Sequence, residues 1–155
     1  KSFRGILADG EQQQIHLAGG DTKTGYKLVK FELMPYVFGA GSGELESVVQ
    51  IFKQKQNAAE ELIDFSKDDL LGAAIINNDS NADQYPTVLT TVFDNEVVNQ
   101  DLYITHKNNH SDAAKVSYYF ELEEVKMKDS EIAVVNYRAG LLHGEWYKHL
   151  SFWVW

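Results

Sequence analysis

The chain lacks cysteine and has only 2 prolines among its 155 residues. Without cysteine it cannot form disulfide scaffolds, thiolate zinc sites, iron–sulfur clusters or a cysteine nucleophile. Basic residues are also few, because 14 lysines and arginines stand against 23 aspartates and glutamates, which gives a formal net charge of -9. Nucleic-acid-binding proteins gain much of their affinity from a basic face, so we expect no nucleic-acid partner.

Long apolar runs are absent as well. No stretch approaches the roughly 18 to 20 consecutive apolar residues that cross a bilayer, and residues 1–5 lack the apolar core of a signal peptide. We therefore expect a soluble protein without a membrane partner. A chain of this length with 44% hydrophobic residues can bury a core of its own, which predicts a single globular domain.

Apolar residues recur at every second position through most of the chain, which is the period of a strand with one buried face. The clearest case is residues 115–122, where every second residue from Val116 to Leu122 is apolar. Glu123 and Glu124 then shift the pattern by one position, which predicts a bulge or a strand end near Glu124. Further strands are predicted at Phe3–Ala8, Gln13–Leu17, Tyr26–Leu33, Ser47–Lys53, Leu62–Phe65, Thr87–Phe93 and Asp101–His106.

Two segments need a closer interpretation. Within the strand predicted at 26–33, strict alternation places Val29 on the buried face together with Phe31 and Leu33. The segment Ser66–Ile76 fits a short helix that begins with a capping box, but Leu70–Ile76 also fits a continuous buried strand. We favour the strand.

Turn residues separate these runs at short intervals, as in an all-β sandwich or barrel. The sequence therefore predicts an all-β fold, namely an antiparallel β-sandwich that is jelly-roll-like and has at most one short helix. Residues 1–135 are expected to form this single sandwich domain. Residues 136–155 differ in composition, because they hold all three tryptophans, and are expected to form an aromatic C-terminal arm.

Several motifs resemble functional sites but fit simpler interpretations. His106 and His110 have a spacing that would bind a metal on a helix, yet they are expected at the exposed tip of a hairpin. The acidic run 79–83 lacks the glycine and glutamate of a calcium loop. The glycine-rich run 39–43, with Ser42 at its centre, lacks the residues of a phosphate loop or a nucleophile elbow. We therefore predict no metal, no cofactor, no catalytic residue and no enzymatic activity.

The C-terminal arm is too apolar to remain in water. It is expected either to pack on its own sandwich or to bury its aromatic side chains against a neighbouring subunit, since tryptophan and tyrosine are the side chains that most often anchor interfaces. The second alternative predicts a homo-oligomer. The interface candidates are Trp146, Tyr147, Leu150, Phe152, Trp153 and Trp155.

Two runs, Phe93–His106 and Ser117–Glu123, resemble a stretch found in small, mostly uncharacterised β-rich proteins of marine tailed phages. The segments Glu46–Val49 and Ile63–Ser66 are similar to earlier parts of the same group, and the resemblance spans most of residues 3–135. It implies a structural component of the virion, such as a capsid cement or decoration protein. The implied partners are copies of the chain itself and a major capsid protein.

A carbohydrate- or receptor-binding β-sandwich module of a tail or surface structure is the alternative function. In this interpretation the outward-facing Tyr103 and Tyr119, together with the loops at 39–43 and 77–83, form a shallow aromatic platform. Cross-strand packing of the two tyrosines is the simpler explanation of their pattern.

Overall fold

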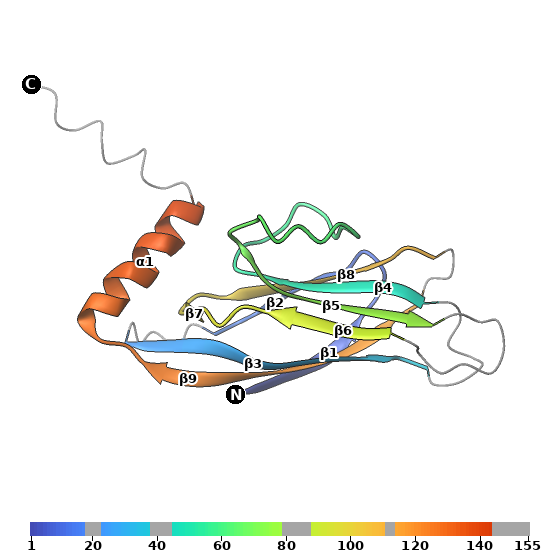
Figure 1. Cartoon of the computed structure of the whole chain (residues 1–155), viewed down its shortest axis with the longest axis horizontal. Helices are drawn as coiled ribbons and strands as arrows, with labels where there is room; N and C mark the ends of the chain where they lie inside the picture. Colours follow the sequence, from blue (N-terminus) through green and yellow to red (C-terminus); the bar gives the residue numbers. More distant parts are fainter. Residues whose placement is uncertain (18–22, 38–44, 79–87, 111–113, 144–155) are drawn as a thin grey trace, which may run out of the picture.

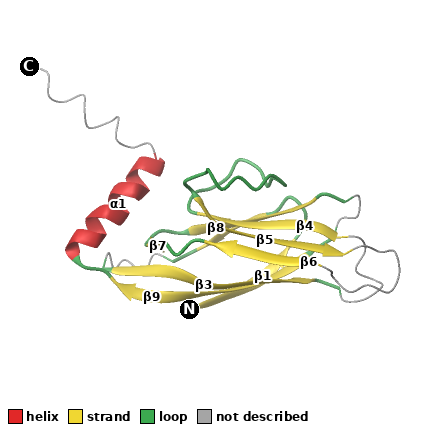
Figure 2. Cartoon of the chain, viewed as in Figure 1, coloured by secondary structure: helices red, strands yellow, loops and turns green. Residues whose placement is uncertain are grey.

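The computed structural model of the chain describes residues 1–17, 23–37, 45–78, 88–110 and 114–143. In this part of the chain, nine strands form two antiparallel sheets, and one helix follows the last strand (Figure 1). Colouring by secondary structure shows the two sheets as stacked layers, with the helix at one end (Figure 2). The predicted all-β sandwich with one helix is confirmed, and its jelly-roll-like form stays a prediction.

The strands are divided unequally between the sheets. The four-stranded sheet has the order β1 (Ser2–Leu7), β9 (Val116–Lys126), β3 (Thr24–Pro35) and β7 (Val97–Val98). The five-stranded sheet has the order β2 (Gln12–Ile15), β8 (Leu102–Asn108), β4 (Leu45–Phe52), β5 (Leu70–Asn78) and β6 (Val88–Phe93). Pairing is nested along the chain, because β1 pairs with β9, β2 with β8 and β3 with β7.

The core lies between the sheets and follows the alternation seen in the sequence. Phe120 on β9 is completely buried at its centre and stacks on Phe3 at a ring-centroid distance of 5.1 Å and on Tyr118 at 6.0 Å. Burial of one such large side chain stabilises the fold by roughly 1.5–3 kcal/mol. Other buried core residues include Leu7, Leu28, Phe31, Val49, Ile51, Leu102, Ile104 and Leu122.

A β-bulge occurs on β3 and not at the position predicted near Glu124. Leu28 pairs with Leu122 and Lys30 with Glu121, so Val29 is the additional residue of a β-bulge in β3. The bulge reverses the facing of the residues before it, so Leu28 is buried and Val29 is exposed. The prediction that Val29 faces the core is therefore wrong. The prediction of a bulge or strand end near Glu124 is also wrong, because β9 continues in register to Lys126.

Residues 70–78 form strand β5, as favoured from the sequence, and the helical alternative is wrong. The strand predicted at Leu62–Phe65 is also wrong, because no strand occurs between β4 and β5. This connection, residues 53–69, instead lies over the outer face of the five-stranded sheet (Figure 2). The Gln50 side-chain amide reaches from that face to the carbonyls of Glu60 at 3.0 Å and Leu62 at 3.3 Å.

Helix α1 (Asp129–His143) begins shortly after β9 and crosses the domain boundary predicted between residues 135 and 136. The Glu131 carboxylate accepts a hydrogen bond from the Lys128 N–H at 2.8 Å, which satisfies a backbone donor at the helix N-terminus. Among the described residues, no helix is both long and apolar enough to cross a membrane. The six aromatic-arm candidates, residues 146–155, lie outside the described residues.

Candidate interaction surfaces

The most enzyme-like contact is a serine–histidine pair between β4 and β8. His106 Nε2 lies 3.0 Å from Ser47 Oγ, and His106 Nδ1 lies 3.0 Å from the Ala8 carbonyl. Because a carbonyl only accepts, Nδ1 carries the proton and Nε2 accepts the hydrogen bond from the serine hydroxyl. His106 is 0% exposed, so the prediction that it lies on an exposed loop is wrong.

Burial decides what this pair can do. It lowers the pKa of the His106 imidazole below its ordinary value of 6.5, although the Ala8 carbonyl and the Asp9 carboxylate oppose the shift. A neutral imidazole is the right form for a base, but Ser47 is also buried. A nucleophile needs a path to its substrate, and this pair is closed from solvent. We interpret it as a polar clamp that joins β4, β8 and the turn after β1.

Metal and phosphate motifs gain no support from the geometry. Among the residues that the structure describes, no three histidine, aspartate or glutamate side chains converge on a possible metal position. His106 is completely buried, and its two ring nitrogens are bonded to the Ala8 carbonyl and the Ser47 hydroxyl, so neither is available to share a metal with His110. The predictions for 79–83 and 39–43 fall outside the described residues.

The two tyrosines of the predicted aromatic platform lie on opposite sides of the molecule. Tyr103 alternates with buried Ile104 on β8, so it faces outward from the five-stranded sheet. Tyr119 alternates with buried Phe120 on β9, so it faces outward from the four-stranded sheet. The thickness of the sandwich separates the two rings, and one platform cannot contain both.

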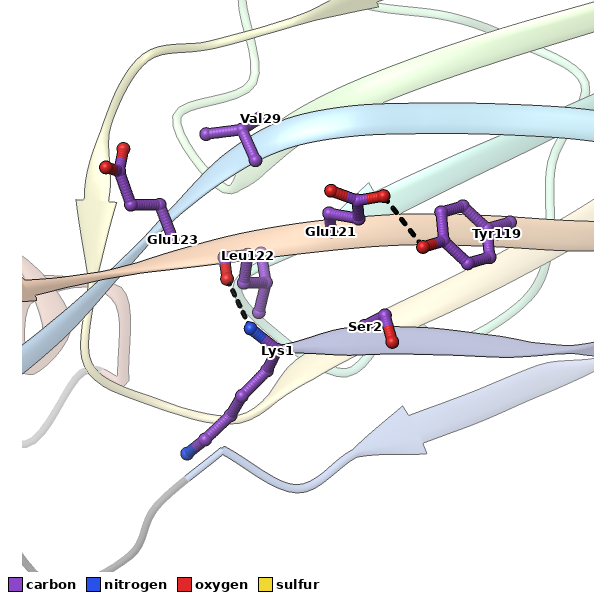
Figure 3. A pocket seen from close by; sticks show the side chains of 7 residues that line it. All are labelled: Lys1, Ser2, Val29, Tyr119, Glu121, Leu122 and Glu123. Carbon is purple, nitrogen blue, oxygen red and sulfur yellow. Dashed lines mark hydrogen bonds between the residues drawn. The ribbon is translucent and has the colours of Figure 1, made fainter.

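A shallow hollow of about 710 Å³ lies around Tyr119 on the outer face of the four-stranded sheet (Figure 3). The Tyr119 hydroxyl donates a hydrogen bond to Glu121 at 2.7 Å, and Lys30 Nζ lies 5.2 Å from the centroid of the ring. The ring and its hydroxyl are therefore already engaged by neighbouring side chains. Glu121 and Glu123 line the same hollow, so it disfavours an anionic ligand.

Apolar side chains are exposed at the opposite end of this face. The register places Ile6, Ser117 and Met34 side by side across β1, β9 and β3. Ile6 is 44% exposed and Met34 is 63% exposed. Tyr36 follows at the end of β3, and Lys115 Nζ lies 5.7 Å from its ring centroid. No part of the described chain covers these side chains in the way that residues 53–69 cover the other sheet.

Exposed polar side chains join helix α1 to the sandwich. Arg138 Nη1 lies 3.4 Å from Glu96 Oε1, and Asn99 Nδ2 donates to Asn136 Oδ1 at 2.9 Å. Both contacts are exposed. Over residues 129–140, no residue is buried. The helix stands at the end of the sandwich rather than across one of its faces (Figure 1).

Glu96, in the connection between β6 and β7, also forms a second ion pair that is more buried than the one with Arg138. Glu96 Oε2 lies 2.8 Å from Lys53 Nζ, and the Lys53 side chain is almost completely buried. A small cavity of about 10 Å³ lies between this ion pair and Val135 and Ala139 of the helix. Val134 and Tyr137 of α1 are both 52% exposed.

Sequence reasoning did not identify Lys53, Glu96 and Arg138 as one cluster. They lie more than 40 residues apart from one another, so no local pattern connects them. Comparison with protein-family models finds no match, and neither the curated proteins nor the solved structures give one. A functional proposal therefore depends on the surfaces of this molecule together with the expectations drawn from its sequence.

Proposed function

We propose that the chain is a non-enzymatic structural protein of a virus particle, most closely a capsid cement or decoration subunit. It assembles with copies of itself and with a major capsid protein. The observation that carries the proposal is helix α1, which stands at the end of the sandwich, has no buried residue over 129–140 and is followed in the sequence by the tryptophan-rich residues 146–155. An exposed helix followed by aromatic anchors suits an arm that binds a neighbour.

The strand order supports a jelly roll. Nested pairing of β1 with β9, β2 with β8 and β3 with β7 is the pattern of a long hairpin rolled into two sheets. Jelly rolls built in this way are common in viral capsid proteins. A fold is shared by many functions, so this order supports the proposal only together with the resemblance to phage proteins.

Charge restricts the partner surface. At a net charge of -9, the chain is repelled by packaged nucleic acid and is attracted to a basic region of a shell protein. The exposed Ile6 and Met34 on the four-stranded sheet offer an additional apolar contact for such a partner.

Mass spectrometry of purified particles from the source of this chain tests the proposal. We expect many copies per particle for the natural chain. When Trp146, Trp153 and Trp155 are replaced together by serine, we expect the chain to be lost from particles while remaining folded in the infected cell. A control that replaces Lys148 and Ser151 by alanine keeps the aromatic residues and should be incorporated normally. Absence of the natural chain from particles, or normal incorporation of the serine variant, would contradict the proposal.

Carbohydrate or receptor binding remains the second candidate function. It is supported by the hollow of about 710 Å³ that Tyr119 lines on the outer face of the four-stranded sheet. Only a few copies per particle, combined with glycan binding by the purified chain, would favour this function over the first.

A further inference from the structure

Strand β6 forms an edge of the five-stranded sheet, where β5 is its only partner among the described strands. Its six residues, 88–93, include no charge, no proline and no glycine. Thr90, Thr91, Val92 and Phe93 are all exposed. Proteins usually protect such an edge with charged residues, proline, a bulge or a very short strand. The described edge of β6 has none of these features.

The other sheet edges are better protected. Strand β7 has two residues and β2 has four, so each offers few backbone groups. Strand β1 carries the exposed charge of Arg4 in its middle. Among the described strands, β6 is therefore the edge that is most open to pairing with another strand.

The backbone of β6 shows which groups are available. The Asp94 N–H donates to the Leu71 carbonyl at 2.8 Å, which continues the ladder between β6 and β5. The backbone hydrogen-bonding groups of an antiparallel strand alternate in direction from residue to residue. The backbone N–H and C=O groups of Thr90 and Val92 therefore also point toward β5. The N–H and C=O groups of Thr91 and Phe93 then point away from the sheet, toward the open edge.

We propose that β6 pairs with β6 of a second copy of this chain and joins two five-stranded sheets into one continuous sheet. Outward-facing groups must meet outward-facing groups, and a two-fold axis midway between the Thr91 residues of the two copies satisfies this condition, with Thr90 of one copy opposite Val92 of the other. In a two-fold pair each residue meets a residue from the same strand. A charged strand would repel itself, and β6 has no charge.

Hydrogen exchange of the full-length chain, followed by NMR at increasing protein concentration, tests this pairing. The amides of Thr91 and Phe93 should exchange more slowly as concentration rises, by about tenfold or more once the pair is populated. The amides of Thr90 and Val92 are the internal control, because they bond to β5 in either state. Protection of Thr91 and Phe93 that does not change with concentration would overturn the proposal.

Disulfide cross-linking gives an independent measurement, since the natural chain has no cysteine. Residues opposite each other in a hydrogen-bonded antiparallel pair have Cα atoms about 5.5 Å apart, which suits a disulfide. The Thr91→Cys variant should therefore form a covalent dimer under mild oxidation. Met34→Cys is the matched control, because Met34 is exposed at 63% but lies on the other sheet. Pairing through β6 would be contradicted if both variants cross-linked equally, or if Thr91→Cys formed no covalent dimer.

This inference extends beyond the virion role and fails separately from it. A chain that is abundant in particles but shows no concentration-dependent protection of β6 would retain the proposed function and lose this interface. A chain absent from particles that still cross-links through residue 91 would show the reverse.

Discussion

At the scale of single residues, the inner face of the sandwich contains a polar cluster where the sequence pattern would suggest a dry core. His106, Ser47 and Asn108 are all buried near the turn after β1. Their hydrogen-bonding groups are satisfied by each other and by backbone groups: His106 bonds to the Ser47 hydroxyl and the Ala8 carbonyl, and Asn108 Oδ1 accepts from the Glu46 N–H at 3.1 Å. A buried polar group costs stability only when it lacks a partner, so the cluster fixes the register of β4 and β8 without a large penalty.

Stability should therefore depend on pH through His106. Burial holds its folded-state pKa below the ordinary 6.5, so as pH falls below about 6.5 the unfolded chain takes up a proton that the folded chain does not. The free energy of unfolding should fall on acidification, by at most about 1.4 kcal/mol per pH unit. Hydrogen bonds keep the pKa of Glu11 below its ordinary 4.5, so its contribution is lost only at lower pH.

Urea unfolding at about pH 7.5 and about pH 5 measures this effect. His106→Gln should reduce the difference in unfolding free energy between the two conditions, whatever its effect on absolute stability. His16→Gln is the control, because that side chain is 77% exposed. Neighbouring Asp9 and Lys107 remain unchanged in both variants. An equal pH dependence in the natural chain and in His106→Gln would show that His106 does not carry it.

At the scale of elements, alternation predicted most strands because one face of each is buried by the opposite sheet. It failed where a different partner covers a segment. Strand β4 is buried on both faces, since the connection 53–69 covers its outer side. That connection contains exposed Leu62 and Phe65, whose apolar character suggested a strand that does not exist. The sequence predicted a bulge near Glu124 on β9, but the bulge lies at Val29 on β3. A shift in the alternation of one strand can be compensated by a bulge in the strand paired with it.

Helix α1 could have been recognised from local signals. Asp129 and Glu131 place negative charge in its first turn, where the helix dipole favours it. Ile132, Val135 and Ala139 then follow at helical spacing and are among its half-buried residues. The ion pairs that position it could not have been predicted, because they join residues that are distant in the sequence. The candidate site at 146–155 stays a prediction.

Glu96 pairs with buried Lys53 and with exposed Arg138, so substitutions in the two pairs should change the free energy of unfolding by different amounts. Glu96→Gln removes the carboxylate that compensates the buried Lys53 ammonium, and should destabilise the fold by about 3 kcal/mol. Arg138→Gln removes a guanidinium whose side chain is 63% exposed, and should cost less than about 1 kcal/mol. Chemical denaturation measures both values. Similar losses for the two variants would contradict the view that the buried pair, not the exposed one, holds this end of the sandwich.

At the scale of the whole molecule, the negative net charge opposes association between copies but favours binding to a basic partner. Each copy carries a formal charge of -9, so two copies repel each other at long range. Strand β6 is neutral, so pairing through it adds no attraction between charges. A basic shell protein would instead be attracted by the same charge. Self-association and docking on such a partner should therefore respond to salt in opposite directions.

Sedimentation velocity of the full-length chain tests the first of these directions. Raising sodium chloride from about 20 mM to about 300 mM shortens the Debye length from roughly 20 Å to below 10 Å, which screens the repulsion between copies. Dimer formation should strengthen with salt. Val92→Lys places a charge beside the proposed two-fold axis and should remain monomeric at both concentrations. A dimer that weakens as salt rises would mean that complementary charged patches, rather than the neutral edge of β6, hold the copies together.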